Sequence, residues 1–215
     1  MPAISASAPG KIILCGEHSV VYGYPAIAIP VFQVTTRVAI FAHPSAINGD
    51  VSLKAPLVGL DTTLDRLSQN DPLWVTIKLV LAELRISHLP PCEIRINSSI
   101  PVGSGLGSSA SVSVALIRAL STFLGHPFSD EQVNLLAYEV EKLHHGTPSG
   151  IDNTVITYQK PVFFKREKPL ELLEVHSPVD LLIADSGIGA STAEAVQGVR
   201  ERWLQKTDEY NRYFY

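Results

Sequence analysis

Hydrophobic and polar residues alternate along the first part of the chain in the way that is typical of β-strands. We expect strands over residues 4–8, 12–14, 20–22, 26–29 and 31–42, where apolar runs or alternating patterns occur. Pro9-Gly10 and the glycines at 16 and 23 are expected to turn the chain between these runs. Because the predicted strands follow one another through short turns, an antiparallel sheet is the natural arrangement.

Helical spacing of apolar residues dominates the middle of the chain. Asn70-Asp71-Pro72 is typical of a helix start, and apolar residues then recur at helical spacing to about residue 86. A half-buried strand is predicted over 93–97, and a long helix over 109–124. Ser129-x-x-Gln132 is a capping box and predicts the start of a further helix. Between the two halves, residues 43–61 are expected to be irregular or to form a hairpin around Asn48-Gly49.

The last third of the chain has weaker patterns. Short apolar runs predict strands over 155–158, 162–165 and 181–185. A last helix is expected from about 195 to 215, after the capping pattern Ser191-x-x-Glu194.

Composition narrows the class of protein. With 215 residues, 46% of them hydrophobic, the chain can form one large domain, or one domain and part of a second. The net charge of −4 provides no basic field for nucleic acid. No signal-peptide pattern and no apolar run of about 20 residues is present, so we expect a cytoplasmic protein without a membrane span. Cys15 and Cys92 are expected to be free thiols in a reducing compartment.

The stretch from Pro101 to Ser111 has three glycines, at 103, 105 and 107, directly before the predicted helix. Glycines let a ligand approach the backbone, and the unpaired N–H groups at a helix start attract an anion such as phosphate. Ser108 and Ser109 lie where hydroxyl groups reach a phosphate or its metal ion. The stretch fits neither the Walker A pattern nor Gly-x-Gly-x-x-Gly, so an ordinary strand-to-helix turn remains an alternative.

Four patches in a fixed order carry a resemblance to a known family. They are Pro-Gly-Lys-Ile-Ile-Leu-Cys-Gly-Glu-His-Ser-Val-Val-Tyr-Gly at 9–23, the glycine-rich stretch at 101–111, Gly-Thr-Pro-Ser-Gly-Ile-Asp-Asn at 146–153, and Ser191-Thr192. Together they resemble the GHMP kinases, the family of galactokinase, homoserine kinase, mevalonate kinase and phosphomevalonate kinase. The variants Gly-Glu-His-Ser-Val-Val-x-Gly and Pro-Ser-Gly-Ile-Asp-Asn favour the mevalonate branch of that family.

The resemblance implies an α+β fold with two lobes. Residues 1–177 would form an ATP-binding lobe like domain 2 of ribosomal protein S5, and residues 178–215 the start of a ferredoxin-like C-terminal lobe. The family carries a third glycine-rich motif in that second lobe, which this sequence lacks, so we expect only part of the lobe. A homodimer is plausible in this family, and the aromatic residues of 210–215 agree with self-association.

The resemblance also implies an activity, namely transfer of the phosphoryl group of ATP to the C5 hydroxyl of mevalonate in isoprenoid biosynthesis, with Mg²⁺. Asp152 matches the catalytic base and Lys11 the lysine beside it. Ser109 and Glu141 match the Mg²⁺ ligands, although Glu141 also fits an ordinary charged helix face. The implied ATP-binding residues are those of the glycine-rich stretch: Pro101, Val102, Gly103, Ser104, Gly105, Leu106, Gly107, Ser108, Ser109 and Ala110.

The expected binding site for mevalonate includes the turn at residues 16–23, which we name the acceptor turn. Glu17 and His18 lie in it, and Ser149 and Thr192 complete the set with Lys11 and Asp152. Thr192 is equally well explained as a helix cap. Two alternative functions stay open: a phosphomevalonate kinase or other small-molecule kinase of this family, and a catalytically incompetent N-terminal fragment that still binds nucleotide.

Overall fold

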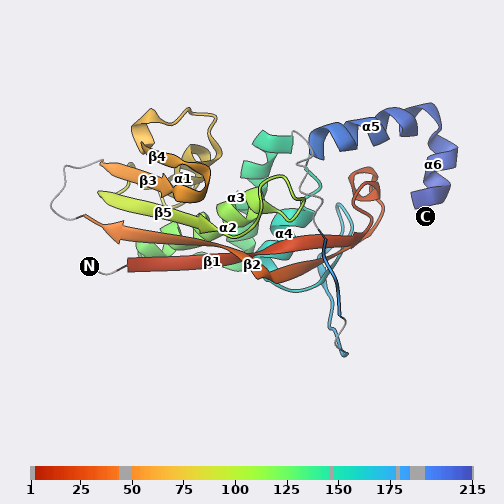
Figure 1. Ribbon diagram of the computed structural model, residues 1–215, viewed down its shortest axis with the longest axis horizontal. Helices are drawn as coiled ribbons and strands as arrows, with labels where there is room; N and C mark the ends of the chain where they lie inside the picture. Colours follow the sequence, from red (N-terminus) through yellow and green to blue (C-terminus); the bar gives the residue numbers. More distant parts are fainter. Residues whose placement is uncertain (1–2, 44–49, 146–147, 178–179, 185–191, 215) are drawn as a thin grey trace.

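A mixed sheet covered by helices forms most of the molecule in the computed structural model, which describes residues 3–43, 50–145, 148–177, 180–184 and 192–214 (Figure 1). The sheet has the strand order β4-β3-β5-β2-β6-β7, and β1 pairs with β2. All pairings are antiparallel except that of β3 with β5. The strands are β1 (Ala3–Cys15), β2 (Ala26–Ala42), β3 (Val51–Ala55), β4 (Leu60–Thr63), β5 (Cys92–Ser98), β6 (Val162–Phe164) and β7 (Glu171–Leu172).

The N-terminal strand β1 is continuous, so the predicted turn at Pro9-Gly10 is wrong. Instead, the pairing of β1 with β2 shifts there: Pro9 lies opposite Thr35, whereas Gly10 lies opposite Val31. Residues 32–34 of β2 are therefore bulged out of the pairing with β1. The same place separates the part of β2 that pairs with β5 from the part that pairs with β6.

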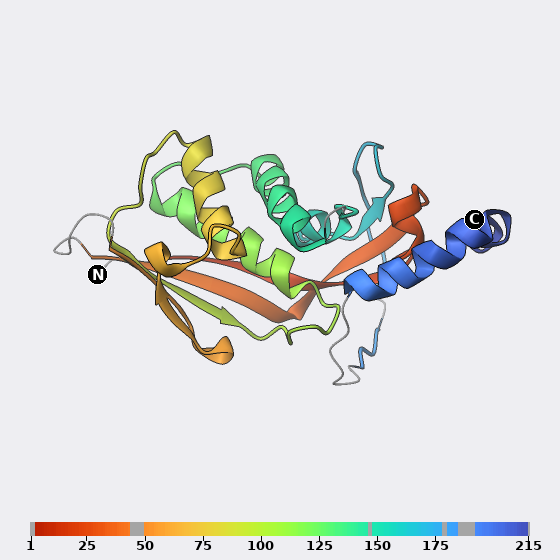
Figure 2. The ribbon, with the colours of Figure 1, turned by 90° about the horizontal axis from the view of Figure 1, so that it is seen from above.

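Helices α1 to α4 cover one face of this sheet (Figure 2). Their buried apolar side chains and those of the strands form one core. The predicted helix starts are confirmed: Asp71 Oδ1 accepts the N–H of Leu73 at 2.8 Å, and Ser129 and Gln132 exchange the two hydrogen bonds of a capping box. The helices are α1 (Pro72–Glu83), α2 (Ser108–Phe123), α3 (Asp130–His145) and α4 (Ile151–Tyr158).

Two predicted strands are helical in the structure. Residues 19–22 form the 3₁₀-helix η1 (Ser19–Tyr22), which Gly23 ends with φ 84°. Residues 155–158 belong to α4, which begins after Gly150 at φ 90°. Both segments are too short and too apolar for periodicity alone to separate helix from strand.

The predicted irregular segment 43–61 contains β3, the 3₁₀-helix η2 (Pro56–Val58) and part of β4, and Asn48-Gly49 lies outside the described residues. A short 3₁₀-helix, η3 (Leu64–Arg66), follows β4. The fold is thus the predicted α+β class.

The chain after β7 differs from the prediction. Residues 181–184 are exposed and form no strand, and Asp185 lies outside the described part. The single predicted C-terminal helix is divided into α5 (Thr192–Gln205) and α6 (Thr207–Phe214). The predicted domain boundary after residue 177 stays a prediction. Among the described helices, none combines the length and the hydropathy that a membrane crossing requires.

Candidate active site

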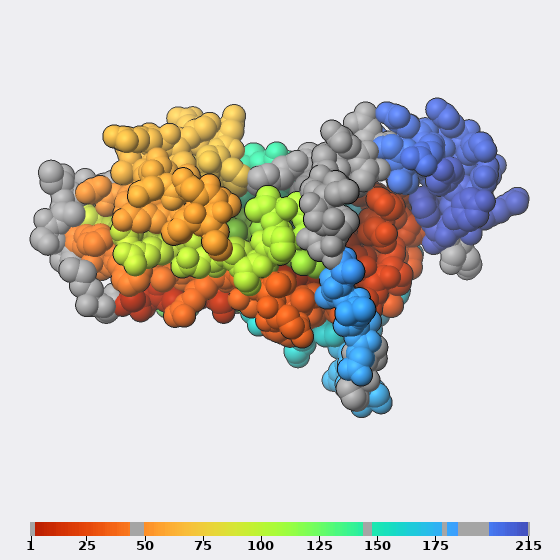
Figure 3. All heavy atoms as spheres, viewed as in Figure 1, coloured from red at the N-terminus to blue at the C-terminus, as the bar shows by residue number. Residues whose placement is uncertain are grey.

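The glycine-rich stretch connects β5 to α2 and is exposed in the middle of one face of the molecule (Figure 3). Gly103, Gly105 and Gly107 all have a positive φ of 75–76°, a conformation that few other residues adopt without strain. Gly107 is the residue directly before α2, and no side chain caps the start of this helix. The first N–H groups of α2 are therefore available to a ligand, as the sequence predicts for a phosphate site.

This stretch packs directly on β1 at Lys11. The backbone N–H of Lys11 donates to the carbonyl of Leu106 at 2.9 Å. A Cβ on Gly107 would lie 2.8 Å from Lys11 Cγ and 2.9 Å from Ile156 Cδ1, so only glycine fits between them. The contact places the lysine side chain beside the start of α2.

Lys11 and Asp152 form an ion pair, with Lys11 Nζ 3.0 Å from Asp152 Oδ2. They are brought together from distant parts of the sequence, because β1 supplies the lysine and the first turn of α4 the aspartate. The Lys11 side chain is 9% exposed and that of Asp152 30%. The carboxylate is thus held by a buried cation while it stays accessible from solvent.

A second polar pair joins the first turn of α2 to α3. Ser109 Oγ donates to Glu141 Oε1 at 2.8 Å, and Glu141 is only 3% exposed. The neighbouring charges of the same helix, Glu139 and Lys142, have side chains that are 42% and 44% exposed, and they pair with each other at 2.7 Å. The alternative that Glu141 belongs to a solvated charged face is therefore wrong.

Of the residues expected to bind mevalonate, Lys11 and Asp152 lie together, and the others have the following positions. Glu17 is exposed and His18 half-buried, directly before η1. Nδ1 of His18 is buried and has no hydrogen-bond partner among the described residues. Ser149 Oγ accepts the N–H of Ile151 at 3.3 Å, which gives it a local role at the start of α4. Thr192 is the first residue of α5, but its side chain, like the whole of Ser191, lies outside the described part.

The sequence analysis missed an apolar pocket of about 460 Å³ that adjoins the glycine-rich stretch. Pro101, Val102 and Ser108 of the glycine-rich stretch line it. The rest comes from β5, α1, α2 and the segment around η2, which was predicted to be irregular: Ala55, Leu57, Val58, Leu60, Leu73, Ile96, Ser98, Ser99, Ile100 and Val112. In the sequence, the apolar pair Leu57-Val58 after Pro56 is a hint of this pocket. Both residues are exposed in the structure.

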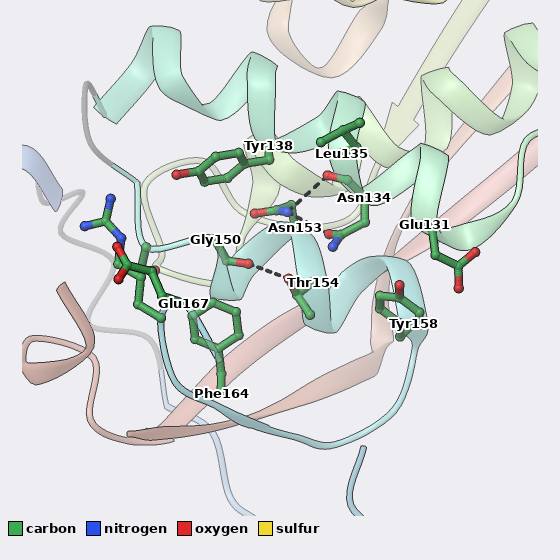
Figure 4. Close-up of a pocket in the computed structure, with 12 residues that line it drawn as sticks. Glu131, Asn134, Leu135, Tyr138, Gly150, Asn153, Thr154, Tyr158, Phe164 and Glu167 are labelled. Carbon is green, nitrogen blue, oxygen red and sulfur yellow. Dashed lines mark hydrogen bonds between the residues drawn. The ribbon is translucent and has the colours of Figure 1, made fainter. Parts of the chain in front are cut away.

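Another pocket, of about 490 Å³, lies between α3, α4 and the loop after β6 (Figure 4). Its lining includes Tyr138, Asn153 and Phe164, but neither Lys11 nor Asp152. Asn153 donates from Nδ2 to the side-chain oxygen of Asn134 at 2.7 Å and ties α4 to α3. The 460 Å³ pocket is the better of these two candidates for a ligand of the active site, because it adjoins the start of α2 and the 490 Å³ pocket does not.

Comparison with known proteins agrees with this arrangement. The family described as GHMP kinases N terminal domain matches residues 72–160. Mevalonate kinase of Pyrococcus horikoshii is 36% identical over 212 residues, with 93% of this chain and 62% of the relative covered. Mevalonate kinase of Arabidopsis thaliana is 31% identical, with 98% and 70% covered.

Solved structures show the same similarity. The crystal structure of L. major mevalonate kinase in complex with R-mevalonate has a TM-score of 0.68 and 31% identity, and the match covers 98% of this chain and 64% of that one. This chain thus spans somewhat less than two thirds of the P. horikoshii and L. major proteins. The fold, the ordered motifs and the relatives agree: the chain belongs to the GHMP kinase family.

Proposed function

We propose that this protein transfers the γ-phosphoryl group of ATP to the C5 hydroxyl of mevalonate. The observation that carries the proposal is the ion pair between Lys11 and Asp152, 3.0 Å apart and next to the uncapped start of α2. A base and a cation are thereby held where a phosphate site and a solvent-accessible acceptor site meet. The similarity to mevalonate kinases supports the choice of substrates.

The nucleotide would bind across the glycine-rich stretch. Its phosphates fit the start of α2, where free N–H groups and the positive end of the helix dipole stabilise negative charge. The apolar pocket of about 460 Å³ adjoins the same stretch and suits the flat, apolar faces of a nucleotide base. Both parts of ATP thus find complementary surfaces side by side.

Asp152 would accept the proton of the acceptor hydroxyl. Phosphoryl transfer depends mainly on positioning and charge stabilisation, and a carboxylate near the hydroxyl assists by removing its proton. Lys11 keeps this carboxylate oriented through the 3.0 Å contact. Its positive charge also stabilises the negative charge of the transferred group. Because the lysine is packed against Gly107, it cannot move far from this position.

Ser109 and Glu141 fit a Mg²⁺ ion that accompanies the nucleotide. A hydroxyl and a carboxylate oxygen meet at 2.8 Å beside the phosphate site, and Mg²⁺ prefers a few such oxygens together with phosphate oxygens and water. Among the described residues, no group of three or more His, Cys, Asp and Glu side chains is placed to hold a metal by itself. The ion would therefore arrive with ATP, and it would neutralise charge on the phosphates.

The acceptor turn supports mevalonate over its phosphorylated form. Residues 16–23 contain no lysine or arginine that would pair with a substrate phosphate, whereas Glu17 and His18 provide hydrogen-bonding groups. Nδ1 of His18 is buried without a hydrogen-bond partner among the described residues, so a local shift of the turn on binding would let it form such a bond. A phosphomevalonate kinase would need additional cationic side chains at this place.

The test is ADP release by the purified chain with Mg-ATP and mevalonate. We expect turnover for the wild type and a fall in kcat of about 10²–10⁴-fold for Asp152→Asn, which keeps the shape but removes the base. Asp130→Asn, on the exposed start of α3, is the matched control and should keep full turnover. Phosphorylation of phosphomevalonate but not of mevalonate would select the alternative kinase. Nucleotide binding without turnover on any acceptor would select the incompetent fragment.

A further inference from the structure

The acceptor turn is a compact unit held together by its own backbone hydrogen bonds. Val20 N–H donates to the carbonyl of Gly16 at 2.9 Å, and Gly23 N–H to that of Val20 at 3.2 Å. At its base, a Cβ on Gly16 would lie 2.5 Å from the carbonyl oxygen of Pro25, so the two ends of the turn are tightly packed. Because these contacts link the residues of the turn, we expect a displacement of Tyr22 to displace His18 as well, four residues earlier in the same turn.

Aromatic rings from the C-terminal helices hold the outer side of this turn. The ring centroid of Tyr22 lies 4.6 Å from that of Trp203 in α5, at an interplanar angle of 28°, and 5.6 Å from that of Phe214 in α6, at 11°. Tyr24 contacts Phe214 edge to face at 5.7 Å. Figures 1 and 2 both show α5 and α6 beside the turn that follows β1.

The contact between Tyr22 and these helices is one of ring stacking. The Tyr22 hydroxyl is buried without a hydrogen-bond partner among the described residues. Burial raises the pKa of Tyr22, and the positive charge of Arg200 partly offsets this rise. The hydroxyl therefore stays protonated and the side chain neutral at physiological pH. Trp203 itself is oriented by a hydrogen bond from Nε1 to Asn211 Oδ1 at 3.0 Å, which joins α5 to α6. The rings of Trp203 and Phe214 thus contact the turn from two helices that this hydrogen bond holds together.

We propose that Trp203 and Phe214 are positioning residues, which fix the acceptor turn by stacking on Tyr22. Their role in acceptor binding rests on the proposed function, because it assumes that His18 contacts mevalonate. Loss of a ring would loosen the turn and weaken acceptor binding. It would leave nucleotide binding unchanged, since the glycine-rich stretch is joined by a backbone hydrogen bond to Lys11 and, in the described part of the chain, by none to η1.

The first test measures hydrogen exchange of the peptide 16–24 in the 215-residue chain, without any ligand. We expect Phe214→Leu and Trp203→Leu to speed exchange at the Val20 and Gly23 amides about three- to tenfold, as loss of one stacked ring predicts. Trp203→Phe should restore slow exchange. Tyr213→Leu is the control, because this neighbour of Phe214 is 74% exposed and its ring contacts Tyr210.

The second test measures the dissociation constants of mevalonate and of a non-hydrolysable ATP analogue. Phe214→Leu and Trp203→Leu should weaken mevalonate binding about three- to tenfold and leave the ATP analogue unaffected. Unchanged exchange and unchanged mevalonate affinity in folded variants would overturn the proposal, as would equal losses for both ligands. If the wild type binds no mevalonate, the proposed function loses its acceptor, and the exchange rates still decide whether the rings position the turn.

Discussion

Replacement of Gly107 by alanine tests the packing of the glycine-rich stretch on Lys11, the lysine that we propose to act in catalysis. A methyl group at this position would lie 2.8 Å from Lys11 Cγ and 2.9 Å from Ile156 Cδ1. Ile156 is completely buried, and Lys11 is anchored to Asp152 at 3.0 Å. Neither neighbour can withdraw freely, so the new methyl group must displace the lysine, the loop, or both.

The expected cost has two parts. A non-glycine residue at φ 76° is strained by about 1–2 kcal/mol. Overpacking against the buried neighbours adds about 1–3 kcal/mol, so Gly107→Ala should destabilise the protein by about 2–5 kcal/mol. Gly125→Ala isolates the first part, because Gly125 has φ 80° at the other end of α2 and its Cβ would meet nothing within 4 Å. This control should lose only about 1–2 kcal/mol.

Urea unfolding gives the two free energies, and ADP release gives the two rates. A displacement of Lys11 by about 1 Å should lower kcat about 10²-fold in Gly107→Ala, whereas Gly125→Ala should keep the wild-type rate. Equal losses of stability in the two variants, together with an unchanged kcat for Gly107→Ala, would refute the argument that the loop positions Lys11 by direct contact.

Three further predictions concern other parts of the molecule. Hydrogen bonding to Lys54 lowers the pKa of Glu93 below its usual 4.5, so the stabilisation by this carboxylate is present above pH 4.5 and is lost as the pH falls through the lowered pKa. Acid titration should show that Glu93→Gln is about 1 kcal/mol less stable than the wild type at pH 7, and that the difference disappears once the pH is below the lowered pKa. Burial raises the pKa of Cys92 to about 12, so iodoacetamide at pH 8 should label only the exposed Cys15, as mass spectrometry of peptides would show. Glu141→Gln should raise the Mg²⁺ concentration for half-maximal ADP release about tenfold or more, and an unchanged requirement would remove this residue from the metal site.

Local sequence signals predicted the elements that are long or clearly capped. The helices after Asp71 and after Ser129 begin where their capping side chains stand, because these hydrogen bonds are decided within a few residues. Val20-Val21-Tyr22 and the segment 155–158 were wrongly predicted as strands, since glycines with positive φ at 23 and 150 allow compact helical turns there. Periodicity could not detect these turns in runs of three or four apolar residues.

In the candidate site too, local sequence signals predicted some features and not others. The glycine-rich stretch and its helix were evident from composition and spacing alone. The pairing of Lys11 with Asp152, and of Ser109 with Glu141, joins residues of separate elements that no local pattern relates, and only the family resemblance led to them. The apolar pocket beside η2 was missed because six separate elements and one connection contribute to it.

The change of register between Pro9 and Gly10, opposite the bulge in β2, decides on which side of the sheet Lys11, the proposed catalytic lysine, lies. Ala6 and Ala8 face the helices before the bulge, and Lys11 and Ile13 do so after it, although an uninterrupted strand would direct residues 8 and 11 to opposite faces. The number of residues on each strand at this point therefore determines the face on which Lys11 lies. A shift of the pairing by one residue at this point would leave the lysine in the sequence and remove it from the site. Natural variants should therefore tolerate changes of residue type here far better than single-residue insertions or deletions.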